Sequence, residues 1–340
     1  MIDYEALQKL YDKDLVYALQ LEIGDVCHQG CIYCYMNAIE QHRNKLSDKT
    51  VFQILSEAKK FGIMAIEWLG GEPLLRGNIF EFMKTSKELG YRNNMWTGGL
   101  PLVDENVRKH TADLCRKGLI SFHLSTIDKK LYKEMHPNRP VSDVDDIIDA
   151  IVKLIEVDKY PPEQILNSVT FTGMQSLEDM KHTMDHFFEN YGIRTSLNVY
   201  HTYLRPGYSK SDLERFIPSR GDVARLYKHY ARQWDANELP MNCVNKQYCS
   251  ATIAILYDGK VTPCATIRPE NAPNINGSKS LSQIFNENKE EMIFNKFKDD
   301  KNLPDKCRIC SLYDSCWGCR SRSYASGNGI YGLDPQCYRR

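Results

Sequence analysis

Six apolar segments of strand length alternate with amphipathic helical segments, and this alternation constrains the fold of the chain most strongly. The expected strands are residues 17–23, 64–69, 92–96, 119–125, 164–171 and 195–203. The expected helices between them are residues 48–61, 79–89, 105–117, 144–157 and 177–190. Strands that alternate with helices form parallel sheets. The sequence therefore predicts an α/β fold, a partial (β/α)6 TIM-like barrel.

Three cysteines directly follow the first expected strand. Cys27, Cys31 and Cys34 have the spacing C-x3-C-x2-C. Thiolate is the ligand that iron-sulfur clusters select, and three thiolates can hold three irons of a 4Fe-4S cubane. The fourth iron then has no protein ligand, and an open position lets a metal site bind a substrate. A partial zinc site and buried apolar cysteines are the alternatives.

A second motif, Gly70-Gly71-Glu72-Pro73, ends the second expected strand, and Ser125 ends the fourth. Paired glycines let the backbone come close to a ligand, although such a pair also occurs in simple tight turns. Parallel barrels place their chemistry at the carboxyl ends of the strands. We therefore expect both positions at the functional site, with a serine that only caps the next segment as the alternative for Ser125.

The C-terminal part is rich in cysteine and lacks the strand-helix alternation. We expect a barrel domain over residues 1–225 and a small cysteine-rich domain over 226–340, with a β-hairpin over 251–264 that turns at Asp258-Gly259. Its cysteines are Cys243, Cys249, Cys264, Cys307, Cys310, Cys316, Cys319 and Cys337. Eight thiolates suffice for two complete 4Fe-4S clusters or for two zinc ions, and paired C-x2-C is also a zinc pattern.

These motifs together resemble those of a known family. The cysteine loop, with Tyr33 before its last cysteine, and the loop at 70–73 resemble the radical S-adenosylmethionine (SAM) superfamily. The order of the C-terminal cysteines, with Gly259 five residues before Cys264, resembles the SPASM extension of that family. Relatives usually have three residues between the cysteines that correspond to Cys316 and Cys319, where this chain has two.

The resemblance implies the cofactors and their contacts. The open iron would bind SAM, the loop at 70–73 would contact the amino group of SAM, and Ser125 would reach its ribose. An inner auxiliary 4Fe-4S cluster and an outer one bring the expected number of clusters to three. The inner set would be Cys243, Cys249, Cys264 and Cys319, and the outer set Cys307, Cys310, Cys316 and Cys337. The resemblance also implies that Cys337, close to the chain end, is ordered.

The chemistry implied by the resemblance is reductive cleavage of SAM to methionine and a 5'-deoxyadenosyl radical, which takes a hydrogen atom from the substrate. Two fully ligated auxiliary clusters favour a net oxidation in which they take the electron. Relatives with two such clusters most often modify peptide or protein side chains, and we expect such a substrate. Ala265 disfavours formylglycine formation, because sulfatase-maturing relatives have an acidic residue there.

Two alternatives remain open for the function. The first is dehydrogenation or epimerisation of a small metabolite such as a sugar or cyclitol, and the second is a non-catalytic iron-sulfur or zinc-binding module. An epimerisation needs a hydrogen donor, for which Cys115 is the cysteine left over. We expect Cys115 to be structural, because it lies in a helix that should be outside the barrel.

Charge and composition limit the partners and the compartment. Lys+Arg and Asp+Glu are both 44, so no basic excess suggests nucleic acid. No apolar run approaches membrane-spanning length, and we expect a cytoplasmic protein. Twelve cysteines in a reducing compartment argue for metal binding or catalysis over disulfides. An electron donor such as flavodoxin or ferredoxin is an expected partner.

Overall fold

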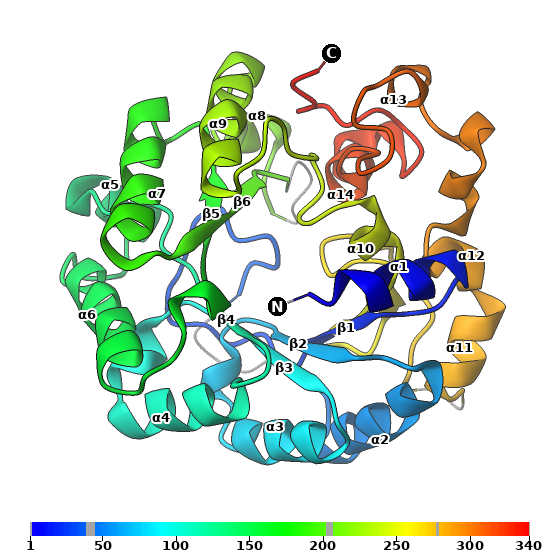
Figure 1. Cartoon of the computed structure of the whole chain (residues 1–340), viewed down its shortest axis with the longest axis horizontal. Helices are drawn as coiled ribbons and strands as arrows, with labels where there is room; N and C mark the ends of the chain where they lie inside the picture. Colours follow the sequence, from blue (N-terminus) through cyan, green and yellow to red (C-terminus); the bar gives the residue numbers. More distant parts are fainter. Residues whose placement is uncertain (1, 39–44, 202–206, 277–278, 340) are drawn as a thin grey trace.

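The fold is organised around one eight-stranded sheet in the order β6-β5-β4-β3-β2-β1-β7-β8 (Figure 1). The computed structural model describes residues 2–38, 45–201, 207–276 and 279–339. Strands β1 to β6 pair in parallel with their neighbours in sequence, which confirms the predicted α/β partial barrel. The strands are β1 (Ala18–Glu22), β2 (Ala65–Leu69), β3 (Arg92–Thr97), β4 (Leu119–Phe122), β5 (Ile165–Phe171), β6 (Arg194–Val199), β7 (Thr252–Ile255) and β8 (Val261–Thr262).

Helices cover the outside of the sheet in Figure 1. The helices between the barrel strands are α2 (Asp48–Ala58), α3 (Ile79–Glu88), α4 (Glu105–Leu114), α5 (Lys129–Met135), α6 (Asp143–Glu156) and α7 (Leu177–Tyr191). Helix α1 (Tyr4–Asp12) precedes the barrel. The helices after β6 are α8 (Lys210–Glu214), α9 (Arg220–Gln233), α10 (Lys246–Ser250), α11 (Leu281–Glu287), α12 (Lys289–Met292), α13 (Asp305–Arg308) and α14 (Arg320–Ser323).

Two predicted strands end earlier than their apolar pattern suggests. β4 ends at Phe122 instead of residue 125, because the side-chain amide of Asn167 takes over the pairing of the next residues. It accepts a hydrogen bond from the Leu124 N–H at 3.1 Å and donates one to the Leu124 carbonyl oxygen at 3.0 Å. β6 ends at Val199, and the expected extension over 202–203 lies outside the described residues.

The two faces of the barrel strands differ in polarity. Apolar side chains such as Ile66, Trp68 and Ile120 point outward into the main core against the helices and are fully buried. The alternate positions line a cavity inside the barrel, and many of these are polar. They include Gln20, Glu67, Asn94, Ser121, Ser168 and Ser196. The barrel interior is therefore an open cavity with polar side chains among the residues of its wall, in contrast to the branched apolar layers that fill closed TIM barrels.

The predicted β-hairpin is present and extends the barrel sheet. β7 and β8 pair antiparallel, and Gly259 in their turn has a φ of +87°. β7 also pairs in parallel with β1, so the C-terminal part shares a sheet with the barrel. Helix α9 runs across residue 225, where we expected the boundary between two domains. Strand β7 and helix α9 thus connect the two parts of the chain, and the division at residue 225 stays a prediction.

A buried ion pair holds the end of the chain against the barrel. Arg322 and Asp334 are 4% and 0% exposed, and the Nη2 of Arg322 lies 2.8 Å from an Asp334 carboxylate oxygen. Arg322 also donates to the carbonyl oxygens of Met241 and of Val199 at the end of β6. Asp334 accepts a hydrogen bond from the Cys319 N–H at 2.9 Å. Residues far apart in sequence thus converge on one pair of charges.

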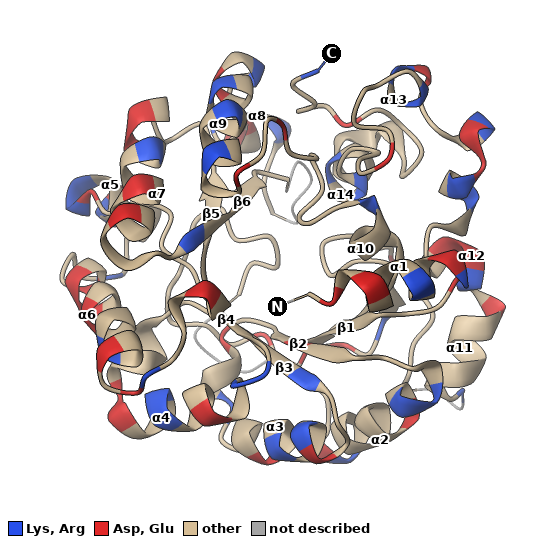
Figure 2. Ribbon diagram, viewed as in Figure 1, with Lys and Arg blue, Asp and Glu red and all other residues tan. Residues whose placement is uncertain are grey.

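Charged side chains of both signs are interspersed over the outer helices, and Figure 2 shows no region of the ribbon dominated by one sign. In the part of the chain that the structure describes, no helix is both long and apolar enough to cross a membrane.

We predict that Asp334→Ala lowers the free energy of unfolding by roughly 3–5 kcal/mol, because it leaves the buried Arg322 charge without its partner. Asp149→Ala removes an exposed ion pair with Lys153 and serves as the control, with an expected loss below about 1 kcal/mol. Denaturant unfolding of anaerobically prepared protein measures both. Equal losses for the two variants would contradict the anchoring role of Asp334.

Candidate active site

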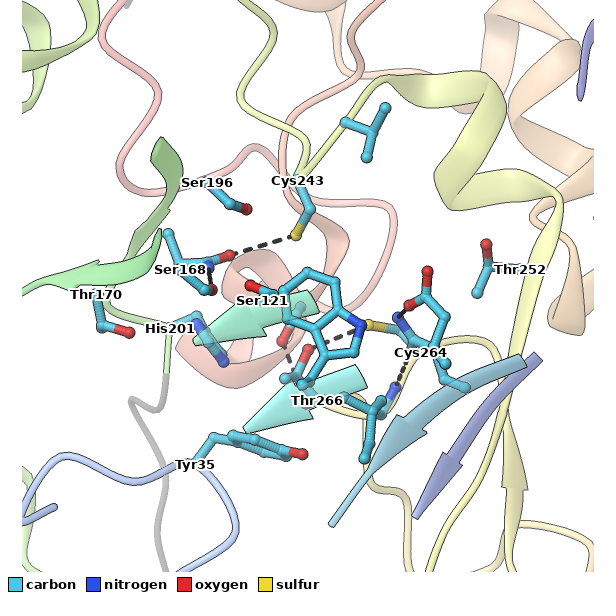
Figure 3. Close-up of a pocket in the computed structure, with 18 of the residues that line it drawn as sticks. Tyr35, Ser121, Ser168, Thr170, Ser196, His201, Cys243, Thr252, Cys264 and Thr266 are labelled. Atoms are coloured by element: carbon cyan, nitrogen blue, oxygen red, sulfur yellow. Dashed lines mark hydrogen bonds between the residues drawn. The ribbon is translucent and has the colours of Figure 1, made fainter. Parts of the chain in front are cut away.

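A cavity of about 470 Å³ occupies the barrel interior. All three cysteines of the N-terminal loop line it, and so do four from the C-terminal part: Cys243, Cys249, Cys264 and Cys319. Figure 3 shows Cys243 and Cys264 around the same cavity as polar strand residues such as Ser121 and Ser168. The cavity therefore lies between two groups of thiols that are more than 200 residues apart in sequence.

The cysteine loop is held at the carboxyl ends of the strands by Gln29. The side-chain amide of Gln29 donates hydrogen bonds to the carbonyl oxygens of Gly98, at 3.3 Å, and His123, at 3.2 Å. These residues follow β3 and β4, so one side chain joins the loop to two strand ends. The Ile32 N–H adds a hydrogen bond to the Met135 carbonyl oxygen at 3.1 Å.

The three thiols of this loop interact with one another. Burial, together with the neighbouring Glu72 and Cys34, raises the pKa of Cys27 to about 12. Burial also raises the pKa of Cys31, followed by the effects of Cys34 and Cys27. Neutral thiols are thus favoured unless a cation is present, and iron would supply the positive charge that stabilises thiolates. The donor set fits the predicted cluster.

The loop at 70–73 packs directly against the chain that enters the cysteine loop. The Gly71 N–H donates to the Gly24 carbonyl oxygen at 3.0 Å, and the Glu72 N–H to that of Val26 at 2.6 Å. A Cβ on Gly71 would lie 2.1 Å from the Val26 oxygen. Gly70 has a φ of +139°, and a Cβ there would lie 2.5 Å from the Gly24 oxygen. Both glycines are needed for this backbone contact.

The carboxylate of Glu72 connects this loop to the end of β3. It accepts hydrogen bonds from the Thr97 hydroxyl at 2.8 Å, the Gly98 N–H at 2.6 Å and the Leu74 N–H at 3.1 Å. Burial raises the pKa of Glu72 to about 7 in spite of these three donors. Pro73 begins the short 3-10 helix Pro73–Leu75. The loop therefore holds a carboxyl group beside the cysteine thiols.

His123 is a site residue that the sequence did not single out. Its Nδ1 lies 2.6 Å from the Ser168 carbonyl oxygen, which can only accept, so Nδ1 carries the hydrogen. The Nε2 atom then accepts a hydrogen bond from the Tyr33 hydroxyl at 2.8 Å. Alternation along β4 places His123 on the same face as Ser121, two residues earlier, and the structure shows that this face lines the cavity.

Ser125 lies beside this group but away from the cavity surface. It is fully buried, and its hydroxyl oxygen accepts a hydrogen bond from the Thr170 N–H at 2.9 Å. The Ser125 hydroxyl oxygen is also 3.3 Å from the His123 Nε2 atom. The hydroxyl therefore links β4 to β5, and the expected contact with a ribose stays a prediction.

The C-terminal thiols form two groups in space. Burial raises the pKa of Cys243, and the neighbouring Cys249, Cys319 and Cys264 raise it further. Burial, with smaller effects of the neighbouring Cys316, Cys337 and Cys310, raises the pKa of Cys307 to about 11 against the opposing charge of Arg320. Each group contains the members of one set implied by the resemblance, and the assignment of the two sets to two clusters stays a prediction.

All twelve cysteines lie among the described residues, and none forms a disulfide there. Within the same residues, no three Cys, His, Asp or Glu side chains are arranged to hold a single metal ion. That finding concerns a single ion, whereas a 4Fe-4S cubane is larger and takes one thiolate at each of its irons.

Two sequence profiles match the chain. That of the radical SAM superfamily matches residues 21–187, and that of the SPASM iron-sulfur cluster-binding domain matches residues 243–311. The fold and the site thus define a partial parallel barrel with an iron-sulfur cluster-binding extension. The chain belongs to the radical SAM superfamily and carries a C-terminal SPASM domain.

The chain is similar to proteins of different activities. A probable GTP 3',8-cyclase of Methanosarcina mazei is 24% identical over 289 residues, which cover 79% of this chain and 83% of the relative. Streptococcus suis SuiB bound to the precursor peptide SuiA has a TM-score of 0.66 at 21% identity, covering 99% of this chain and 81% of SuiB. The structure of anSMEcpe with bound AdoMet and Cp18Cys peptide has a TM-score of 0.67 at 17% identity, and the match covers 95% of this chain and 94% of anSMEcpe. At these identities the two structures show a common fold.

We predict that Gly71→Ala lowers the free energy of unfolding by about 1–3 kcal/mol, because the new Cβ displaces the backbone at Val26. The iron content should fall by about four atoms, the content of one cubane. Gly77→Ala is the control, since a Cβ there meets nothing within 4 Å. Iron analysis and thermal unfolding measure the effects, and an unchanged Gly71→Ala protein would contradict the proposed contact.

Proposed function

We propose that this chain is a radical SAM enzyme with three 4Fe-4S clusters that oxidatively modifies a peptide or protein side chain. Cys27, Cys31 and Cys34 hold the N-terminal cluster and leave one iron for SAM. When bound and reduced, this cluster supplies the electron that splits SAM into methionine and a 5'-deoxyadenosyl radical. Gly70, Gly71, Glu72 and Pro73 form the pocket for the amino group of SAM, and Ser125 is retained as the ribose contact.

The residues around the loop position and shield this chemistry. Gln29 keeps the cysteine loop against the ends of β3 and β4, and Glu72 presents its carboxyl group next to the thiols. The C-terminal segments form the opposite wall of the cavity, which limits the access of water to a reactive radical.

The observation that carries the proposal is that two groups of thiols line one cavity. The N-terminal cysteines lie on one part of its wall and the inner set on another, whereas the outer set is not part of the lining. A substrate in this cavity can lose a hydrogen atom at one place and an electron at the other. A cluster held by the inner set would accept that electron and one held by the outer set would pass it on, whereas a donor such as flavodoxin or ferredoxin would supply the electron for the cleavage of SAM.

The oxidation balances with these components. The substrate C–H bond breaks and its hydrogen atom forms 5'-deoxyadenosine. The substrate radical would then lose one electron to a cluster held by the inner set and one proton to water. A double bond, or a new C–S or C–C bond, would form in place of the two hydrogens that are lost. The position of Cys115 favours this oxidation over an epimerisation, which would need Cys115 to donate a hydrogen atom to the substrate. Cys115 is 0% exposed and belongs to the main apolar core, away from the cavity lining.

Charge favours a peptide over a nucleoside triphosphate. Among the described residues that line the cavity, the basic side chains are Arg92, Arg320 and Arg322. Arg322 is paired with Asp334, and Arg320 donates to backbone carbonyl oxygens. Arg92 donates to the Tyr17 hydroxyl at 2.8 Å. A triphosphate needs several cations that are available to it, and these arginines already have partners.

The peptide-bound structures of SuiB and anSMEcpe, which share the fold, agree with a peptide substrate. Ala265 lines the cavity and its N–H donates to Gln20, so no acid occupies this position. Formylglycine formation stays disfavoured. A sugar or cyclitol is the second candidate substrate, because the many hydroxyl and amide side chains in the lining suit a neutral polar molecule.

We predict that anaerobically reconstituted protein contains about twelve irons, four for each of three cubanes, and forms 5'-deoxyadenosine when reduced with dithionite in the presence of SAM. Replacing Cys27, Cys31 and Cys34 with alanine should remove about four irons and abolish 5'-deoxyadenosine. Cys115→Ala is the control and should keep all the iron. Cleavage of SAM by the triple variant would refute the assigned site, and colourless, zinc-loaded wild-type protein would favour a binding module.

We further predict that GTP gives no new product and does not raise the rate of SAM cleavage above the rate without substrate. Pools of short synthetic peptides should include some that raise this rate at least tenfold and lose 2 Da, as a two-hydrogen oxidation requires. Mass spectrometry and chromatography of 5'-deoxyadenosine measure both. Conversion of GTP to a cyclised product would instead place the chain with its cyclase relatives.

A further inference from the structure

Two buried arginines share one buried carboxylate where helix α14 begins. Arg320 and Arg322 are each 3% exposed, and Asp334 is 0% exposed. Both Asp334 oxygens accept hydrogen bonds from Arg322, at 2.9 and 2.8 Å. In the part of the chain that the structure describes, Arg320 has no ion pair of its own. Arginine stays protonated in proteins, so the three side chains together carry one positive charge in excess.

Hydrogen bonds fix the Arg320 guanidinium in place without compensating its charge. Arg320 donates to the carbonyl oxygens of Ile330 and Gly332, each at 2.8 Å, and to that of Trp317. The guanidinium carbon also lies 5.0 Å from the centroid of the Phe297 ring. Carbonyl oxygens carry only partial charges, and a buried charge is stabilised fully only by an anion. The positive charge therefore stays available to nearby anions.

The nearest anions left are thiolates of both cysteine sets. Arg320 directly follows Cys319 of the inner set in sequence. Its charge interacts first with Asp334 and then with three thiols that come from both sets, those of Cys307, Cys319 and Cys316. Asp334 also neutralises Arg322, so one carboxylate serves two guanidinium groups. The charge in excess thus lies between the inner and the outer set.

A positive charge at this place favours electron uptake on both sides of it. A 4Fe-4S cluster with four thiolate ligands is an anion, and its net charge is one determinant of its reduction potential. Reduction adds a further negative charge, which a nearby cation stabilises. The effect is strong in a buried region, because the low effective dielectric constant weakens screening.

We propose that Arg320 is a positioning residue shared by the two auxiliary clusters and that its charge stabilises their reduced states. The substrate radical loses one electron, and the cluster of the inner set is reduced by that electron, so no further reactant is needed. The inference rests on the proposed function in so far as the two sets hold clusters. It adds a residue, not a ligand itself, that raises the potential of the electron acceptor.

The test compares reduction potentials in anaerobically reconstituted full-length protein. Cys27, Cys31 and Cys34 are replaced by alanine in every sample, so that only the auxiliary clusters contribute to the signal. Arg320→Gln removes the charge, and Arg320→Lys keeps it. Arg308→Gln is the matched control, because Arg308 also directly follows a cysteine but is exposed and paired with Asp305. Redox titration followed by electron paramagnetic resonance gives the potentials.

Arg320→Gln should shift the ratio of oxidised to reduced cluster at least tenfold toward the oxidised form, which corresponds to a potential lower by about 59 mV for one electron. Arg320→Lys should stay within about threefold of the parent protein, since net charge sets the potential. Arg308→Gln should change the ratio by less than about twofold, because exposed charges are screened. An unchanged Arg320→Gln would overturn the proposal. A lysine variant as low as the glutamine variant would also overturn it, because hydrogen bonds would then be responsible.

Iron content decides the case in which Arg320→Gln assembles poorly. Loss of iron in Arg320→Gln alone would still assign the effect to the charge, whereas equal loss in Arg320→Lys would show that the arginine only holds the loop and would overturn the proposal. Formation of 5'-deoxyadenosine is recorded on the wild-type protein. If the potential shifts but no 5'-deoxyadenosine forms, the role of Arg320 stands and the proposed function fails. If 5'-deoxyadenosine forms and the potential does not shift, the proposed function stands and the role of Arg320 fails.

Discussion

The backbone contact between Gly70–Gly71 and the segment at Gly24–Val26 is the constraint on which the site depends. It holds the start of the cysteine loop against the second strand at a separation that no Cβ allows. Glu72 extends this contact to Thr97 and Gly98, and Gln29 extends it to His123. The cysteine loop is thus fixed to three strand ends by hydrogen bonds, and the thiols take positions set by the rigid sheet.

The polarity of the inner strand face is the second requirement. A barrel whose inward side chains were branched and apolar would fill its own interior. Here Gln20, Asn94, Ser121 and Ser168 leave a cavity, and most of their polar groups are paired with one another or with the C-terminal segments.

The C-terminal part is joined to the barrel by three kinds of contact. β7 continues the parallel sheet beside β1, Arg268 forms two hydrogen bonds to the buried Glu22, and Arg322 binds Asp334 and the end of β6. These contacts place the inner set of thiols on the wall of the barrel cavity. Both cysteine groups therefore line the same cavity.

The sequence by itself determined the parallel strand-helix order, the cysteine loop, the 70–73 loop, the hairpin at Gly259 and the family, because each is a local pattern or a spacing along the chain. Only the tertiary structure decided that β7 extends the barrel sheet, that β4 ends at Phe122 through Asn167, and that His123 lines the cavity. These features depend on contacts between residues far apart in sequence, and a single strand does not reveal which of its two faces meets a cavity.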